Sequence, residues 1–83
     1  MRVVLSPAAQ RDLRRLSAEV NRRVIADLYG LADEPRPPGC LLLRDQKPPT
    51  WRIRVGDWRV LYEIDDGAGI VRIRSVHHRS KAY

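Results

Sequence analysis

The sequence predicts an α+β domain in which two helices cover one face of an antiparallel sheet. Apolar residues recur at helical spacing within residues 7–31. Three runs of alternating apolar and polar residues follow within residues 51–76, which is the pattern of half-buried strands. A chain of 83 residues has the length of one domain, so we expect residues 1–83 to form a single unit.

The first third of the chain predicts a strand and a helical hairpin. Residues 2–5 (RVVL) are rich in β-branched side chains, which favour a strand. Ser6 then supplies an N-cap, with Pro7 at the first helical position. Ser17 is a second N-cap residue and begins the second helix. The apolar face of that helix comprises Val20, Val24, Leu28 and Leu31.

The second half of the chain predicts the rest of the sheet. Prolines within residues 35–38 end the second helix, because proline lacks the N–H that a helix requires. The strands predicted after them are residues 51–55, 58–64 and 70–76, joined by Gly-Asp and Asp-Asp-Gly-Ala-Gly turns. Residues 41–43 (LLL) are either a further short strand or a loop, so we expect three or four antiparallel strands.

Composition favours a nucleic acid or an acidic protein as the partner. The formal net charge is +6, and of the 16 basic residues only Lys47 and Lys81 are lysines. The planar guanidinium of arginine matches phosphate in a bidentate way that lysine does not. A single cysteine fits a reducing compartment, and no run is apolar enough for a signal peptide or a membrane span. We therefore expect a cytoplasmic protein without membrane contact.

Alternation along the predicted strands separates arginine from the core. In residues 51–55, Ile53 and Val55 share one face, whereas Arg52 and Arg54 share the other. In the same way Arg59 lies opposite the apolar stripe of its strand. Two interpretations are open at this point: an ordinary solvated face that uses arginine, or a surface that binds a polyanion.

Several motifs resemble the RelE/ParE superfamily of type II toxins. They are the basic strand WRIRV, the segment GDWRVLYEI after it, the acidic glycine turn, and VHHR with a late tyrosine. The resemblance implies a small α+β domain of the microbial-ribonuclease type. It also implies a cognate antitoxin that blocks the toxin, and contact with operator DNA only through the toxin–antitoxin complex.

The resemblance also implies site residues. The two basic positions of the first hairpin strand fall on Arg52 and Arg54, the arginine of the next motif on Arg59, and the last two positions on Arg79 and Tyr83. Arginine replaces the lysines usual at the first two positions. The predicted phosphate contacts are Arg52, Arg54, Arg59, Arg74 and Lys81.

The RelE-like members of this superfamily cut RNA without a metal. Such cleavage requires a general base, a general acid and cations that stabilise the phosphorane. Arginine suits only the last task, because it stays protonated in proteins. Tyr83 can serve as a base if nearby cations lower its pKa, and His77 and His78 titrate near the operating pH. In an extended strand the two rings point to opposite faces, so only one can join the site. Adjacent histidines without a cysteine cluster do not make a zinc site, and we expect no cofactor.

Three functions are compatible with the resemblance. RelE-like members are ribonucleases that cut mRNA in the ribosomal A site without a metal, and this reading is favoured here. ParE-like members share the fold but inhibit DNA gyrase and lack the ribonuclease residues. A catalytically inactive member would serve only as an operator-binding partner of its antitoxin.

Overall fold

The structure, a computed structural model, describes residues 1–81. The elements in chain order are β1 (Arg2–Leu5), α1 (Pro7–Arg14), α2 (Ala18–Asp33), β2 (Leu41–Leu42), β3 (Trp51–Val55), β4 (Trp58–Asp65) and β5 (Ile70–His78). The strands form one five-stranded sheet in the order β1-β5-β4-β3-β2. The predicted α+β fold, with a helical hairpin and a sheet, is confirmed.

The sheet is mixed, whereas the sequence predicted only its antiparallel part. Strands β2 to β5 pair antiparallel, which gives the four strands expected at most. Strand β1 adds a fifth at the far edge and runs parallel to β5, with Arg2 opposite Ile70 and Leu5 opposite Ile73. This pairing joins segments near the two ends of the chain, so no local sequence pattern predicts it.

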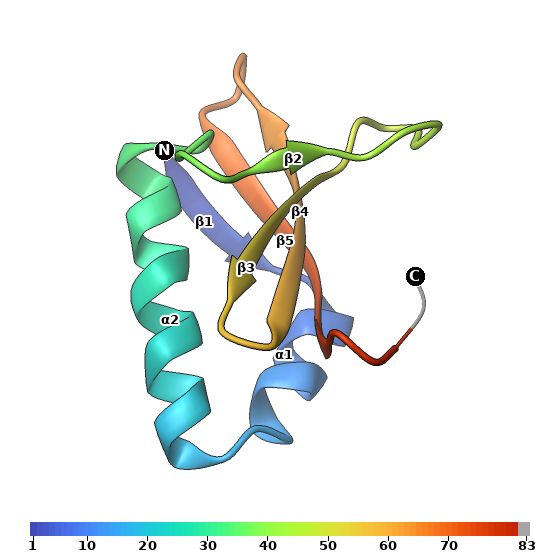
Figure 1. Ribbon diagram of the computed structural model, residues 1–83. Coiled ribbons are helices and arrows are strands. Elements are labelled where there is room, and N and C mark those ends of the chain that lie inside the picture. Colours follow the sequence, from blue (N-terminus) through green and yellow to red (C-terminus); the bar gives the residue numbers. More distant parts are fainter. Residues whose placement is uncertain (82–83) are drawn as a thin grey trace.

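Both helices pack on the same face of the sheet (Figure 1). Helix α2 contacts β1 and β3, so it crosses the strands between them, and α1 packs on β5. Neither helix is both long and apolar enough to cross a bilayer. The helices bury Ala9, Leu13, Val24, Leu28 and Leu31 against the sheet residues Ile53, Val55, Val60, Tyr62, Val71, Ile73 and Val76.

Tyr62 is the largest fully buried side chain of the core. Its hydroxyl donates a hydrogen bond of 2.8 Å to the carbonyl of Pro35, in the loop after α2. Burial of the ring raises the pKa of Tyr62, so the hydroxyl stays protonated and keeps donating this bond. The core thereby ties the loop between α2 and β2 to the centre of the sheet.

A β-bulge divides β5 into two halves. Leu61 of β4 is opposite Ser75, but the next residue, Tyr62, is opposite Ile73, so Arg74 is an extra residue. Strict alternation from Ile73 would turn His77 toward the helices. The bulge reverses that phase, so Val76 enters the core and His77 turns to the opposite face.

Beyond the end of β1, Ser6 and helix α1 supply hydrogen-bond partners for the exposed backbone groups of β5. The Ser6 hydroxyl donates to the carbonyl of Arg74 at 2.8 Å, and the Ser6 N–H donates to the carbonyl of Ile73 at 3.0 Å. The N–H of Val76 donates to Oδ2 of Asp12 at 2.9 Å. Three hydrogen bonds therefore hold the bulged segment against α1, and no partner strand is needed there.

Replacing Ser6 by alanine is expected to destabilise the protein more than replacing Ser17. Both hydroxyls cap a helix, by accepting the N–H of Ala9 at 3.0 Å and of Val20 at 3.3 Å. Only Ser6 also donates to Arg74 across the fold. In urea unfolding we expect Ser6→Ala to cost about 2 kcal/mol and Ser17→Ala about 1 kcal/mol. Equal losses would show that the bond to Arg74 adds no stability.

Candidate functional site

The face of the sheet opposite the helices carries a row of basic side chains. Across β3, β4 and β5, Arg54 is opposite Arg59, and Arg59 is opposite His77. Side chains directly opposite on neighbouring strands have Cβ atoms about 5 Å apart. Arg52 lies on the same face, two residues before Arg54. We call Arg52, Arg54, Arg59 and His77 the basic row.

The three arginines of the basic row lack acidic partners among the described residues. The ion pairs there use Arg36, Arg72, Arg74 and Arg79 instead. Arg52 is only 9% exposed, and the Nε atoms of Arg52 and Arg59 are buried without a hydrogen-bond partner. Buried charge without a partner is costly, so these groups are suited to meet an anion that comes from outside the fold.

A small cavity of about 240 Å³ lies at the end of the basic row, at the β3–β4 turn. Its lining residues are Arg54, Gly56, Asp57, Arg59 and Arg79. The Arg79 N–H donates to the carbonyl of Asp57 at 2.8 Å, and its Nε lies 3.7 Å from Asp57 Oδ1. Both groups of that ion pair are well exposed, so the pair is weak and leaves Arg79 able to turn toward a ligand in the cavity.

The two histidines point to opposite faces, as the sequence indicated for an extended strand. His78 lies on the helix side with Trp58, where their rings meet edge to face with centroids 5.3 Å apart. The Nδ1 atom of His78 is 3.0 Å from the hydroxyl of Ser80. His77 is therefore the histidine that the structure brings into the basic row, and His78 is not.

The environment of His77 favours its neutral form. Partial burial of the ring is the main influence and lowers its pKa below 6.5. The carboxylate of Asp12 acts in the opposite direction and raises it, whereas the charge of Arg59 lowers it further. An imidazole that is neutral near pH 7 can accept a proton, which is what a general base must do.

The remaining residues predicted from the sequence are placed differently. Arg74, the extra residue of the bulge, pairs through Nε with Glu63 at 3.3 Å and donates through Nη1 to Thr50 at 3.0 Å. Lys81 is exposed after the end of β5. Tyr83 lies outside the described residues.

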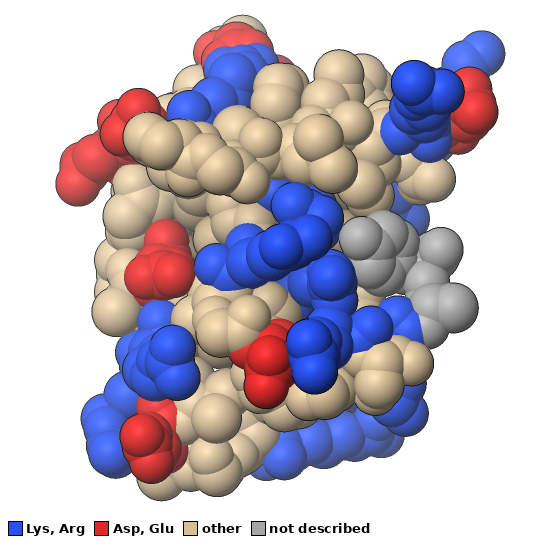
Figure 2. Space-filling view, viewed as in Figure 1, with Lys and Arg blue, Asp and Glu red and all other residues tan. Residues whose placement is uncertain are grey.

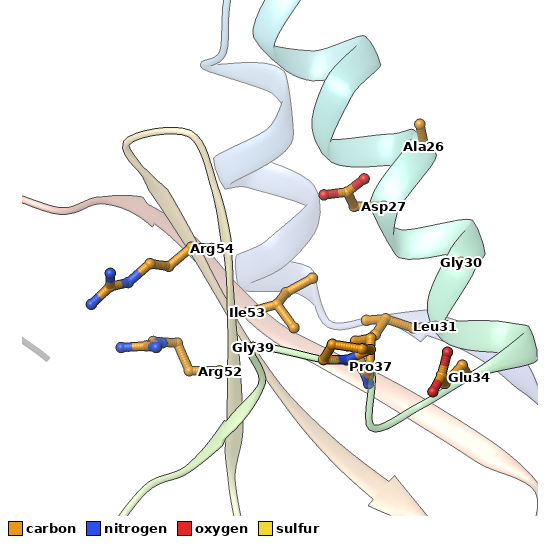
Figure 3. Close-up of a pocket in the computed structure, with 11 residues that line it drawn as sticks. Ala26, Asp27, Gly30, Leu31, Glu34, Pro37, Gly39, Arg52, Ile53 and Arg54 are labelled. Carbon is orange, nitrogen blue, oxygen red and sulfur yellow. The ribbon is translucent and has the colours of Figure 1, made fainter.

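A larger hollow of about 550 Å³ lies between α2 and β3 (Figure 3). Arg52 and Arg54 contribute to its wall, but Figure 3 shows both guanidinium groups directed away from α2. The carboxylates of Asp27 and Glu34 stand at this hollow instead. Negative charge repels phosphate, so the hollow is a poor site for a nucleic acid.

Lysine and arginine gather on the surface over the β3–β4 hairpin, with an acidic group beside them near its turn (Figure 2). The lower part of α2 and the region of α1 add further basic surface in the same view. Within residues 1–81, no three histidine, cysteine, aspartate or glutamate side chains are grouped so as to hold a metal ion. The basic row itself offers three guanidinium groups and one imidazole.

Comparison with known proteins identifies the family. Residues 3–83 match the family model described as the ParE toxin of the type II toxin–antitoxin system parDE. The toxin RelE of Mycobacterium tuberculosis is 34% identical over 82 residues, which cover 98% of this chain and 84% of that protein. This chain belongs to the RelE/ParE family of type II toxins.

Solved structures of family members have the same fold. The archaeal RelE–RelB complex from Pyrococcus horikoshii matches with a TM-score of 0.83 at 25% identity, over 98% of this chain and 97% of that chain. The toxin–antitoxin complex RelBE2 from Mycobacterium tuberculosis matches with a TM-score of 0.81 at 32% identity, over 94% and 96%. The fold expected from the resemblance is thus confirmed for this toxin.

Sequence reasoning missed two acidic residues that border the toxin's basic row. Asp57 was read only as part of a turn, but it pairs with Arg79 at the small cavity. Asp12 was assigned no role, but it accepts the N–H of Val76 in β5, beside His77. The position of Asp57 in a Gly-Asp turn between two arginine-bearing strands was a usable signal. Nothing local could have revealed Asp12, because its partner is 64 residues away.

The stability of this toxin is expected to fall as the pH drops below about 6.5, in part through His77. The folded state lowers the pKa of His77, so the unfolded chain binds the proton more tightly. The contribution is complete above pH 6.5 and is lost as the pH falls through the folded pKa. His77→Gln should reduce the fall in unfolding free energy between pH 7.5 and pH 5.5, measured in urea. His78→Gln is the control, and an equal pH dependence in wild type and His77→Gln would contradict the expectation.

Proposed function

We propose that this toxin is a ribosome-dependent, metal-independent endoribonuclease that cuts mRNA in the ribosomal A site and so inhibits translation. One observation supports the proposal above others. Arg52, Arg54 and Arg59 lie together on one face without acidic partners among the described residues, beside a histidine that favours its neutral form. Phosphate is the anion that such a cluster of guanidinium groups matches best.

The chemistry divides among the residues of this face. Attack of the ribose 2′-hydroxyl on the neighbouring phosphorus breaks the bond to the 5′-oxygen and passes through a phosphorane with extra negative charge. Arg54, Arg59 and Arg79 border one cavity and would stabilise that charge. His77 would take the proton of the 2′-hydroxyl or deliver one to the 5′-oxygen. Tyr83, proposed from the family resemblance, would serve as the other proton-transfer group.

The substrate strand would lie along the open face of the sheet. Arg52, Arg54 and Arg59 would contact successive phosphates, and each contact would add a salt-dependent contribution to affinity. Arg74 and Lys81 would contact further phosphates of the strand. For this, the ion pair between Arg74 and Glu63 must partly break. No cofactor enters this scheme. Among the described residues, His78 meets Trp58 edge to face and lies within hydrogen-bond distance of Ser80, and we assign it no step.

The similar proteins support the proposal of an antitoxin partner. The toxin RelE is similar over almost this whole chain, and similar toxins were solved together with RelB antitoxins. We therefore assign this toxin a cognate antitoxin that neutralises it, with operator DNA contacted through the complex. Its site of action would be the cytoplasm, where ribosomes and mRNA meet.

A second function has one observation in its favour. The matching family model is described as a ParE toxin, and the family resemblance associates the ParE branch with inhibition of DNA gyrase without nuclease activity. In that case the basic row would bind a protein or DNA surface, and His77 and Tyr83 would be dispensable for toxicity. An inactive toxin that only assists its antitoxin on the operator would not be toxic when expressed alone.

Primer extension on mRNA from a cell-free translation reaction tests the proposal. We expect wild type to produce cuts within ribosome-bound codons. Arg59→Ala should lower the rate of cutting about 10²-fold, because a preorganised donor to the developing charge is lost. Tyr83→Phe should also weaken the cuts if its hydroxyl transfers a proton.

Arg72→Ala is the matched control. Arg72 is on the same strand as His77, but its guanidinium lies 3.8 Å from Asp65, outside the basic row. Its loss should change the rate less than twofold, since surface ion pairs contribute little. If wild type makes no cuts and translation proceeds normally, the ribonuclease proposal is wrong, and inhibition of gyrase supercoiling becomes the assay.

A further inference from the structure

Asp12 of α1 contacts the backbone of β5 next to His77 of the basic row. It is the one acidic residue of α1, and it is half-buried. Its Oδ2 accepts the N–H of Val76 at 2.9 Å, one residue before His77. A helix side chain thus fixes the strand at the point where the bulge has turned the next ring outward.

The charged groups that face His77 come from three elements. Arg59 of β4 is directly opposite, and Arg54 of β3 is one strand further in the same row. Asp12 of α1 is on the other side of β5. A protonated His77 ring would face the cation of Arg59, and Asp12 supplies the negative charge that offsets it. A ring that transfers protons must be able to hold one, so this balance matters for catalysis.

We propose that Asp12 is a positioning residue for His77. Its carboxylate holds the backbone at Val76 so that the ring faces the basic row, and its charge offsets Arg59 when the ring is protonated. The catalytic consequence rests on the proposed ribonuclease function, but the interaction itself does not. The influences on His77 agree with this assignment: burial and Arg59 lower its pKa, and Asp12 raises it.

Asp12→Asn separates the two roles of the carboxylate. The amide oxygen of asparagine can still accept the N–H of Val76, whereas the negative charge is gone. Asp12→Ala removes both. We would measure the titration of the His77 ring by NMR in isotopically labelled protein, together with hydrogen exchange of the Val76 amide.

In Asp12→Asn we expect the titration midpoint of His77 to move to lower pH and the Val76 amide to remain protected. Asp66→Asn is the control, since Asp66 pairs with Arg36 through exposed side chains. An unchanged His77 midpoint in a folded Asp12→Asn protein would overturn the proposal.

Arg59→Gln gives an independent check that does not touch α1. Removing this cation should raise the His77 midpoint, opposite to the effect of Asp12→Asn. The proposal therefore stays testable even if both Asp12 variants fail to fold. No change in Arg59→Gln would contradict the arrangement of charges on which the proposal depends.

The pH profile of RNA cutting connects the interaction to catalysis. Asp12→Asn should move the limb of the profile governed by His77 in the same direction as the NMR midpoint. An equal loss of rate at every pH would instead indicate a merely structural role and would overturn the catalytic part. If wild type cuts no RNA but the midpoint still moves, the ribonuclease function fails while the link between Asp12 and His77 is supported.

Discussion

The alternation of side chains along β3 and β4 is the constraint on which the functional face depends. Ile53, Val55 and Val60 must face the helices, because they supply the core of a small domain. The residues that alternate with them then face the other side of the sheet, and three of these are arginines: Arg52, Arg54 and Arg59. Like charges opposite one another on neighbouring strands are destabilising. The free toxin carries this electrostatic cost, and a bound polyanion would relieve it.

The β-bulge in β5 places the imidazole of His77 in the same row. If the side chains of β5 alternated without the bulge at Arg74, His77 would point into the core. The bulge is held at the edge of β5 by Ser6 and Asp12 of the α1 segment rather than by another strand. The N-terminal helix is therefore connected to the functional face through hydrogen bonds, although it packs on the opposite face of the sheet. A change in α1 can alter the site without touching an arginine.

Local physics made much of the fold predictable, and distant contacts made the rest unpredictable. The caps at Ser6 and Ser17 and the alternation in β3 and β4 were read correctly, because each depends on neighbours within a few residues. The parallel pairing of β1 with β5 and the bond from Val76 to Asp12 join segments more than 60 residues apart. The bulge also escaped prediction, since the residues that hydrogen-bond to it, Ser6 and Asp12, are distant in the sequence.

The dependence of RNA affinity on salt tests most directly whether the unpaired arginines bind phosphate. The measurement compares the slope of log affinity against log salt for a single-stranded RNA among three proteins: wild type, Arg54→Gln/Arg59→Gln and Arg36→Gln/Arg72→Gln. Each lost phosphate contact should reduce the slope by about 0.7, so the first variant should lose about 1.4. The second variant, whose arginines pair with Asp66 and Asp65, should keep the wild-type slope. Equal slopes for all three proteins would contradict the account.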